Sequence, residues 1–272
     1  MDFSASALSS VEASAIENNS AEFLCAFGRA GGGEERVGAR IRWIIGGSPL
    51  GYYNAVVRAS LGHDEAAGEI AASIDCMRRR AVSGTWHLGP LSTPTDLAEL
   101  LLARGFRHDV DEMGMAVKLD RVPRDIIAPP ELIISRVRGG SDLAAWVNAL
   151  GRGFGEGLAF AEWAGGALHR FGFDDSQPWR HYLGRLGGKP VATATLFEHG
   201  GNAGIYFVST VPAFRRRGIG SAVTLAALWD AGACGCSLGV LRSSSQAVSM
   251  YKRLGFVTYC KVSTYELHVP LS

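Results

Sequence analysis

The stretch of sequence that decides the fold is Val208-Ser-Thr-Val-Pro-Ala-Phe-Arg-Arg-Arg-Gly-Ile-Gly-Ser-Ala222. It predicts a strand over 203–211, a turn with three consecutive arginines, and a helix that opens at Gly218. The first N–H groups of a helix have no intrahelical partner and carry a partial positive charge, so they suit a phosphate. Glycines let that phosphate approach the backbone. We therefore expect this turn to bind a diphosphate.

Two familiar phosphate-binding loops do not fit this turn. The chain has no Gly-Lys-Ser/Thr here, so the turn is not a Walker-type loop. Val223 stands where the dinucleotide fingerprint has its third glycine, and no acidic residue follows about 20 residues later to hold a ribose. Taken alone, the turn also fits a plain reading, a solvated basic loop before an ordinary core helix.

A second segment favours the binding interpretation. It reads Ser244-Ser-Gln-Ala-Val-Ser-Met-Tyr-Lys-Arg-Leu-Gly-Phe256 and follows an apolar strand over 237–241. Ser244 or Ser245 is expected to cap a short helix over 245–253, and Gly255 is expected to end it in the left-handed conformation. A helix that ends in a Gly-Phe pair is therefore predicted directly after a buried strand.

Together, the two segments resemble the GCN5-related N-acetyltransferase (GNAT) family over residues 131–272. The diphosphate signature of that family, Arg/Gln-x-x-Gly-x-Gly/Ala, matches Arg215, Gly218 and Gly220. Its tyrosine, four residues before a Gly-Phe pair, matches Tyr251. The resemblance implies a mixed α/β sheet flanked by helices, acetyl-coenzyme A as donor and an amine as acceptor.

The resemblance also implies roles for particular residues. The pantetheine arm would lie along the main chain of 208–210, where a backbone N–H would stabilise the oxyanion. Tyr251 would protonate the leaving thiolate, although a buried structural aromatic is the alternative. Ser244 would hydrogen-bond the coenzyme or act only as a helix cap. The expected coenzyme-binding set is Val208, Ser209, Thr210, Arg215, Arg216, Arg217, Gly218, Ile219, Gly220, Ser221 and Ser244.

The sequence leaves the general base and the acceptor open. Many family members carry a glutamate early in the fourth strand, and Gly204 holds that position here. Nearby candidates for the base are Glu198, His199 and His181, each of which also suits an ordinary hairpin or surface position. A water chain, or an amine that binds already neutral, would serve as well. Candidates for an aromatic acceptor pocket, or simply for core positions, are Phe160, Trp163, Phe171 and Trp179.

The first part of the chain resembles the second at a spacing of 150 residues. Leu101-Leu-Ala-Arg-Gly-Phe106 and Tyr251-Lys-Arg-Leu-Gly-Phe256 differ by 150 positions (255 minus 105), and the hairpin at 41–61 falls on 191–211. This spacing predicts two GNAT-like domains in tandem, at 1–120 and 131–272, joined by a linker over 121–130. An unrelated α+β domain is the alternative for the first part.

The first copy is expected to have lost its chemistry. At this spacing, Glu65-Ala-Ala-Gly-Glu-Ile70 stands opposite the arginine turn, and carboxylates there would repel a diphosphate. Leu101 stands opposite Tyr251 and has no proton to donate. We expect this domain to bury a sheet face or to help enclose the acceptor.

Composition limits the remaining function classes. The chain has 272 residues, 47% of them hydrophobic, and a formal net charge of +1. That charge excludes a nucleic-acid-scale basic field. Five scattered cysteines predict reduced thiols and a cytoplasmic protein, and neither they nor the seven histidines have metal-ligand spacing. No membrane span or signal peptide is expected.

Two hypotheses for function follow. The first is an acetyl-coenzyme A-dependent N-acetyltransferase that acts on a primary amine, preferably of a small molecule, with one active half. Mycothiol synthases share the tandem plan, but no residue here selects their substrate. The alternative is a non-catalytic acyl-coenzyme A-binding sensor or scaffold, which the absent strand-four carboxylate favours and Tyr251 opposes. The oligomeric state is not readable from the sequence.

Overall fold

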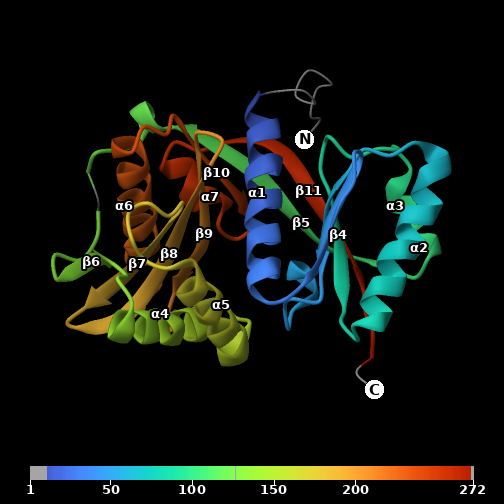
Figure 1. The fold of residues 1–272 in the computed structure, drawn as a ribbon. Coiled ribbons are helices and arrows are strands. Elements are labelled where there is room, and N and C mark those ends of the chain that lie inside the picture. The colour runs from blue at the N-terminus through green and yellow to red at the C-terminus, as the bar shows by residue number, and fades with distance from the viewer. Residues whose placement is uncertain (1–10, 126, 271–272) are drawn as a thin grey trace. The chain divides into compact units, whose positions relative to one another are not determined.

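The computed structural model describes residues 11–125 and 127–270. By its internal contacts the chain divides into two compact units (Figure 1). Unit 1 comprises residues 1–114, 242–245 and 258–272, and unit 2 comprises residues 115–241 and 246–257. The contacts therefore do not follow the linear order, because the end of the chain groups with its beginning. The predicted linker over 121–130 between domains at 1–120 and 131–272 stays a prediction.

Unit 1 contains the strand order β1-β2-β3-β4-β11. The last strand of the chain, β11, pairs antiparallel with β4, and Ser263 lies opposite Leu88. Strand β5 begins in this unit and ends in unit 2. The elements that start in unit 1, apart from β11, are α1 (Val11–Ala30), β1 (Glu34–Val37), β2 (Ile41–Ile45), η2 (Gly51–Tyr53), β3 (Ala55–Ala59), α2 (His63–Arg79), β4 (Gly84–Leu88), α3 (Leu97–Ala103) and β5 (Arg107–Lys118).

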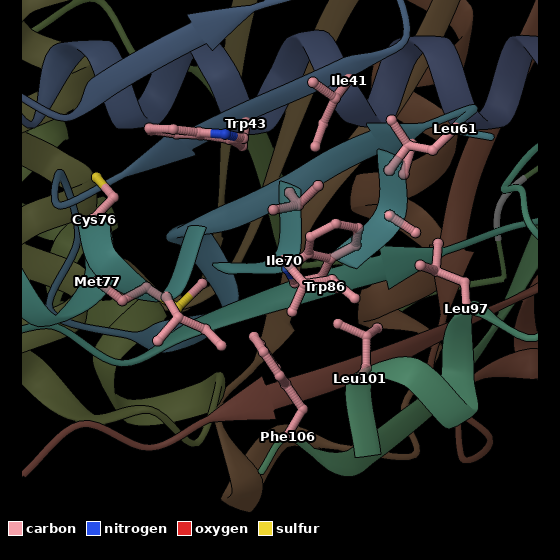
Figure 2. Close-up of a cluster of buried hydrophobic side chains, with 14 of the residues drawn as sticks. Ile41, Trp43, Leu61, Ile70, Cys76, Met77, Trp86, Leu97, Leu101 and Phe106 are labelled. Atoms are coloured by element: carbon pink, nitrogen blue, oxygen red, sulfur yellow. The ribbon is translucent and has the colours of Figure 1, made fainter. Parts of the chain in front are cut away.

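The core of unit 1 forms around Trp86 of β4 (Figure 2). Ile70 and Met77 from α2 and Leu101 from α3 belong to the same fully buried cluster. The indole Nε1–H of Trp86 donates to Ser73 Oγ at 3.1 Å, so its one polar atom is satisfied. A continuous core of this kind, with two helices on one sheet, makes unit 1 a folded body in its own right.

Unit 2 contains the strand order β10-β9-β8-β7-β6. Strands β6 to β9 are antiparallel neighbours, whereas β9 and β10 are parallel, so the sheet is mixed as predicted. The elements that follow β5 in the chain are η3 (Leu119–Arg121), β6 (Leu132–Arg136), α4 (Gly140–Gly153), α5 (Gly157–Phe171), β7 (Trp179–Leu186), β8 (Lys189–His199), β9 (Asn202–Thr210), η4 (Pro212–Phe214), α6 (Ile219–Ala233), β10 (Leu238–Ser243), α7 (Val248–Arg253) and β11 (Val257–Leu267).

Alternation along β7 shows that helices cover both faces of the sheet in unit 2. Tyr182 donates its hydroxyl to Asp230 of α6 at 2.7 Å. The next residue back, His181, lies edge-on to Trp146 of α4, with ring centroids 6.1 Å apart. Successive strand residues point to opposite faces, so α4 and α6 lie on opposite sides of the sheet.

Paired glycines form two hairpin turns of unit 2. Gly187 and Gly188 join β7 to β8 with φ of 55° and 76°, and Gly200 and Gly201 join β8 to β9 with φ of 57° and 73°. Two successive positive φ angles define the type I′ turn, whose twist matches that of antiparallel strands. Glycine adopts this conformation without steric cost.

The repeated Gly-Phe pairs form the same helix end in both units. At the end of α7, the N–H of Phe256 donates to Tyr251 O and the N–H of Gly255 donates to Lys252 O, each at 3.1 Å. At the end of α3, Phe106 and Gly105 donate in the same way to the carbonyls of Leu101 and Leu102. This is the Schellman motif, in which a left-handed glycine satisfies the last carbonyls of a helix.

Two local predictions are wrong. Helix α7 begins at Val248, and its cap is Ala247, which makes no side-chain cap hydrogen bond, so neither Ser244 nor Ser245 is the cap. The constant spacing of 150 also fails at the arginine turn. Three residues (60–62) join β3 to α2, whereas eight (211–218) join β9 to α6. Gly62 therefore corresponds to Gly218, and unit 1 lacks the arginine turn instead of carrying acidic residues in its place.

Candidate functional site

Strand β9 carries a bulge in the middle of the expected donor segment. The register with β8 shifts between Thr193, which pairs with Ser209, and Thr195, which pairs with Tyr206. Within the bulge Phe207 adopts φ of 50°, and its carbonyl accepts a hydrogen bond from Thr193 Oγ1 at 2.7 Å. A bulge disrupts the ladder locally and turns main-chain groups away from their regular partners.

The other edge of β9 separates from β10 at the same place. The two strands pair in parallel only from Leu238 with Asn202 to Val240 with Gly204, although β9 continues to Thr210. Past Gly204, the register therefore leaves the β10-facing main chain of β9 without a partner from β10. An extended ligand can add to such an edge as an extra strand.

The turn after β9 leads into the N-terminus of α6. Gly218 is the N-cap with φ of 77°, and Arg216 is also left-handed with φ of 62°. The first intrahelical hydrogen bond runs from Ala222 N to Gly218 O at 3.0 Å. Ile219, Gly220 and Ser221 come before this bond, and within the described part of the chain their N–H groups donate to no carbonyl. These donors converge at the positive end of the helix, where an anion binds well.

Gly218 has two reasons to be glycine. Its positive φ is unfavourable for any residue with a Cβ. A Cβ at this position would also collide with the carbonyl oxygen of Ile127. Gly220 differs, because a Cβ there would meet Thr210 Oγ1 and Met250 Sδ only at 3.4 Å, an ordinary contact. Gly220 thus leaves the main chain at the start of α6 without a side chain, although no neighbouring atom would clash with a Cβ there.

The three arginines of the turn are not equivalent. Arg215 donates from Nε to Thr210 O at 3.0 Å and from Nη2 to Gly153 O at 2.9 Å. Arg216 and Arg217 are exposed, and in the described residues their guanidinium groups make no hydrogen bond or ion pair. All three arginines are exposed, but Arg216 and Arg217 are available to an anion, whereas Arg215 donates to two main-chain carbonyls.

Ser209 and Ser244 lie in different environments. Ser209 is 4% exposed, and its Oγ has no hydrogen-bond partner among the described residues. Two other buried atoms of the same unit, Trp146 Nε1 and His181 Nε2, also lack a partner among those residues. Ser244 is exposed in the loop after β10 and groups with unit 1. Val208 and Thr210 alternate with Ser209 along β9 and are half-buried.

The ring of Tyr251 packs in the structure, whereas its hydroxyl is available for chemistry. Its ring contacts Phe256 with centroids 5.6 Å apart, which is the apolar contact that accompanies a Schellman motif. The side chain is only 6% exposed, and burial raises the pKa of its hydroxyl above the ordinary value of 10. Among the described residues, that hydroxyl makes no hydrogen bond. Tyr251 therefore presents a protonated, unpaired hydroxyl at neutral pH.

The candidates for a general base are all constrained. Glu198 forms an ion pair with Arg180. His199 is exposed and stacks on Phe197, with centroids 6.2 Å apart. His181 is buried, with Nδ1 2.9 Å from Thr195 Oγ1, and burial lowers the pKa of its imidazole to about 3. A ring with that pKa is neutral at physiological pH but is a weak proton acceptor.

The four aromatic candidates for the acceptor pocket lie in two groups. Phe160 contacts Trp163, with centroids 5.7 Å apart, and also faces Phe207 of the β9 bulge. Phe171 stacks on Trp179 at 4.6 Å, and that pair continues to Phe197. Only the first group is next to the candidate donor segment. The sequence did not single out Phe207, whose only local signal is its place directly before the predicted coenzyme-binding segment 208–210.

The corresponding place in unit 1 is filled by its own side chains. Strand β3 has a bulge at the same point as β9, between the pairs Arg42 with Arg58 and Trp43 with Val56. The cavity beside Val57, between α1 and β4, measures about 10 Å³, which is room for one water molecule. Arg242 lines it, with Nη2 2.5 Å from Glu112 Oε2 and Nη1 2.8 Å from His87 Nδ1.

The N-terminus of α2 is likewise closed to an external anion. Glu65 lies in the first turn, and its Oε2 accepts a hydrogen bond from the N–H of Gly62 at 2.7 Å. Arg40 pairs with the same carboxylate at 2.9 Å. A carboxylate of the chain itself thus lies at the N-terminus of α2, where it would repel an external anion.

A sequence model described as the acetyltransferase (GNAT) family matches residues 150–256. This range contains the bulged strand, the arginine turn and Tyr251. Residues 150–256 are a GNAT acetyltransferase domain. The GNAT fold implies acetyl-coenzyme A as co-substrate, so the coarse activity of the chain is acyl-coenzyme A-dependent acyl transfer. No curated protein matches the chain.

Solved GNAT structures extend the likeness of fold to both units. A GCN5-related N-acetyltransferase from Kribbella flavida is 18% identical with a TM-score of 0.69, covering 94% of this chain and 95% of its own. One from Sphaerobacter thermophilus is 17% identical with a TM-score of 0.65, covering 94% and 93%. A tandem GNAT protein from the clavulanic acid biosynthesis pathway is 13% identical with a TM-score of 0.59, covering 95% and 96%. The predicted tandem GNAT fold is confirmed.

The described residues show neither a membrane-spanning helix nor a metal-binding cluster. In residues 11–125 and 127–270, no helix has the length and apolar character needed to cross a bilayer. The same residues contain no group of three or more His, Cys, Asp or Glu side chains arranged to hold a metal ion.

Proposed function

We propose that unit 2 transfers the acetyl group of acetyl-coenzyme A to a primary amine of a small molecule by direct attack on the thioester. The observation that carries this proposal is the coincidence, within one segment, of an open β9 edge and an unpaired helix N-terminus. A coenzyme has both an extended amide-bearing arm and a diphosphate, and these two features suit its two parts.

The coenzyme would be held mainly by main-chain groups. The diphosphate would accept hydrogen bonds from the N–H groups of 218–221, and Arg216 and Arg217 would add charge. The pantetheine arm would lie along 208–210, and Ser209 Oγ, which is buried without a partner, has the capacity for one more hydrogen bond. Ser244 keeps its place in the proposal as a further coenzyme contact.

The chemistry needs a neutral amine, an oxyanion donor and an acid for the thiolate. A backbone N–H of the bulged segment would stabilise the oxyanion. The unpaired hydroxyl of Tyr251 would protonate the coenzyme A thiolate as it departs. His181 is buried with a lowered pKa, Glu198 is held in an ion pair with Arg180, and His199 stacks on Phe197 at the end of β8. We therefore propose that the amine loses its proton to water. Holding both reactants together then supplies much of the rate.

The first copy, within residues 1–120, is proposed to be degenerate. Two observations support this: the internal Glu65 cap on α2, and the Arg242 side chain that fills the place beside the β3 bulge. The proposed domains remain 1–120 and 131–272, joined by a linker over 121–130. A single coenzyme site per chain is expected.

The second candidate function is a non-catalytic acyl-coenzyme A-binding sensor. The observation in its favour is Gly204, which leaves β9 without a carboxylate at its start. One experiment separates the two functions: release of free coenzyme A from acetyl-coenzyme A, measured over a panel of primary amines. Turnover with any amine supports the enzyme, whereas micromolar binding of coenzyme A without turnover across the panel supports the sensor.

A further inference from the structure

The side chain of Arg215 links two segments that are far apart in the sequence. Its Nε–H donates to the carbonyl of Thr210, at the end of β9, at 3.0 Å. Its Nη2 donates to the carbonyl of Gly153, at the end of α4, at 2.9 Å. Charge-assisted hydrogen bonds of this kind are about twice as strong as neutral ones. The signature arginine therefore directs these N–H groups at the protein itself and not at a diphosphate.

Gly153 is the point where α4 rests on β9. It is the last residue of α4, so its carbonyl is one of the four that the helix leaves unpaired. A Cβ on Gly153 would collide with Ser209 Oγ and would lie 3.0 Å from Thr210 C and Val211 N. The helix end thus packs directly on the strand end, and Arg215 joins the two.

The residue after Gly153 is an aromatic that borders the donor segment. Phe154 stacks on Phe160, with centroids 5.7 Å apart, and contacts Phe207 edge-on at 6.1 Å. Its side chain nevertheless stays 38% exposed. Phe207 is the bulge residue directly before Val208, so one side of the Phe154 ring lies at the proposed reacting segment and another side is open to solvent.

Beyond Phe154, little else holds the loop 153–157, which joins α4 to α5. Gly155 and Gly157 adopt φ of 102° and 82°, and a Cβ on either would meet no atom within 4 Å. Phe154 itself is the C-cap of α4, and its N–H donates to Leu150 O at 2.8 Å. The position of its ring therefore depends on the end of α4, which Arg215 anchors at Gly153, and on the ring contacts.

We propose that Arg215 is a positioning residue for the acceptor and not a ligand of the diphosphate. It anchors the loop 153–157 on the end of β9 and so holds Phe154 where the ring contacts the apolar part of the acceptor amine. This inference rests on the proposed function. It assigns the diphosphate to the N–H groups of α6 and to Arg216 and Arg217, and it assigns an apolar substituent to the acceptor.

The test compares Arg215→Gln with Arg217→Gln, which removes the same charge from the same turn without removing a tie to Gly153. Coenzyme A affinity is measured by calorimetry, and KM for 2-phenylethylamine is measured at saturating acetyl-coenzyme A. Arg215→Gln should raise KM for the amine about tenfold or more and change the coenzyme Kd less than twofold. Arg217→Gln should raise the coenzyme Kd severalfold, and more strongly at low salt, and leave KM for the amine within twofold.

A double-mutant cycle tests whether Arg215 acts through Phe154. If it does, Arg215→Gln should add little to the KM increase of Phe154→Ala, because the ring that it positions is already gone. Arg215→Lys, which keeps one donor and the charge, should restore part of the lost affinity for the amine. Ethanolamine, which has no apolar substituent, should be less affected than 2-phenylethylamine by both single variants.

Each contrary result has a distinct meaning. Equal loss of coenzyme affinity in Arg215→Gln and Arg217→Gln would make Arg215 a diphosphate ligand and overturn the inference. Additive effects on KM in the double-mutant cycle would also overturn the inference. A lower thermal midpoint of Arg215→Gln with unchanged KM and Kd would overturn it too, and would leave Arg215 as a cap of α4. Wild-type turnover with at least one amine decides the proposed function first. Its absence across the panel would overturn both, whereas turnover with a failed variant comparison overturns only the inference.

Discussion

Replacing Tyr251 with phenylalanine removes one hydroxyl and keeps the packing of the ring. The ring contact with Phe256 at 5.6 Å and the Schellman hydrogen bonds of α7 involve no atom of that hydroxyl. Because the hydroxyl makes no hydrogen bond within the described chain, its loss leaves no buried partner unpaired. We therefore expect the free energy of unfolding to change by less than about 0.5 kcal/mol.

The effect on turnover should be far larger. A positioned general acid contributes roughly 10²–10⁴-fold, which corresponds to about 3–5 kcal/mol in activation free energy. Burial raises the pKa of Tyr251, so the wild-type hydroxyl stays protonated through neutral pH and kcat should show no loss of this acid below about pH 10. Coenzyme A affinity should stay within about twofold, since the ring remains.

Tyr182→Phe is the matched control in the same unit. Tyr182 is also buried, but its hydroxyl donates to Asp230 at 2.7 Å, so its loss should destabilise the fold by about 1–3 kcal/mol and leave kcat unchanged. The assay combines urea unfolding with coenzyme A release for both variants. A Tyr251→Phe enzyme with near-wild-type kcat would refute the acid role and leave the thiolate to depart through water.

Three further predictions test the site and the fold. Gly220→Asp should weaken coenzyme A binding at least tenfold in calorimetry because a carboxylate would face the diphosphate. Gly232→Asp, on the exposed end of the same helix, should leave that binding unchanged. A titration that shows two equivalent sites per chain would contradict the single-site proposal. Gly218→Ala should lower the urea midpoint more than Gly188→Ala, since both glycines have positive φ but only the first would collide with Ile127; equal losses would show that the loop yields freely. Burial lowers the pKa of His181 from 6.5 to about 3. The free energy of unfolding should therefore keep its full value above pH 6.5 and decrease as pH falls toward 3, by up to about 1.4 kcal/mol per pH unit. His181→Leu should flatten this acid limb in urea unfolding measured from pH 7 to pH 4, and an unchanged limb would show that His181 does not titrate in this way.

Local patterns were sufficient for most elements of unit 2. The predicted strand over 203–211 overlaps β9, and the predicted strand over 237–241 overlaps β10. Paired glycines form both hairpin turns, because a type I′ turn demands positive φ at two adjacent residues. The Gly-Phe helix ends are equally local, since the Schellman motif lies within six consecutive residues.

Comparison of the two copies was less reliable where loop length differs. A single spacing of 150 aligned the helix ends at Gly105 and Gly255, but the connection before α2 is shorter than the one before α6. Sequence comparison therefore placed Glu65 opposite Arg215, whereas the structure places it in the first turn of α2 as a cap. Insertions in surface loops cost little free energy, so spacing is conserved poorly there.

The amino-acid sequence by itself determined the strand–turn–helix at 208–222 and its resemblance to the GNAT family. Only the tertiary structure decided what the side chains of that segment do. Arg215 finds its second acceptor 62 residues away, on Gly153, and β11, at the end of the chain, pairs within unit 1 with β4, where Ser263 lies opposite Leu88. Backbone conformation follows from neighbours in the sequence, whereas hydrogen-bond partners and strand neighbours depend on how distant segments pack, which no local pattern encodes.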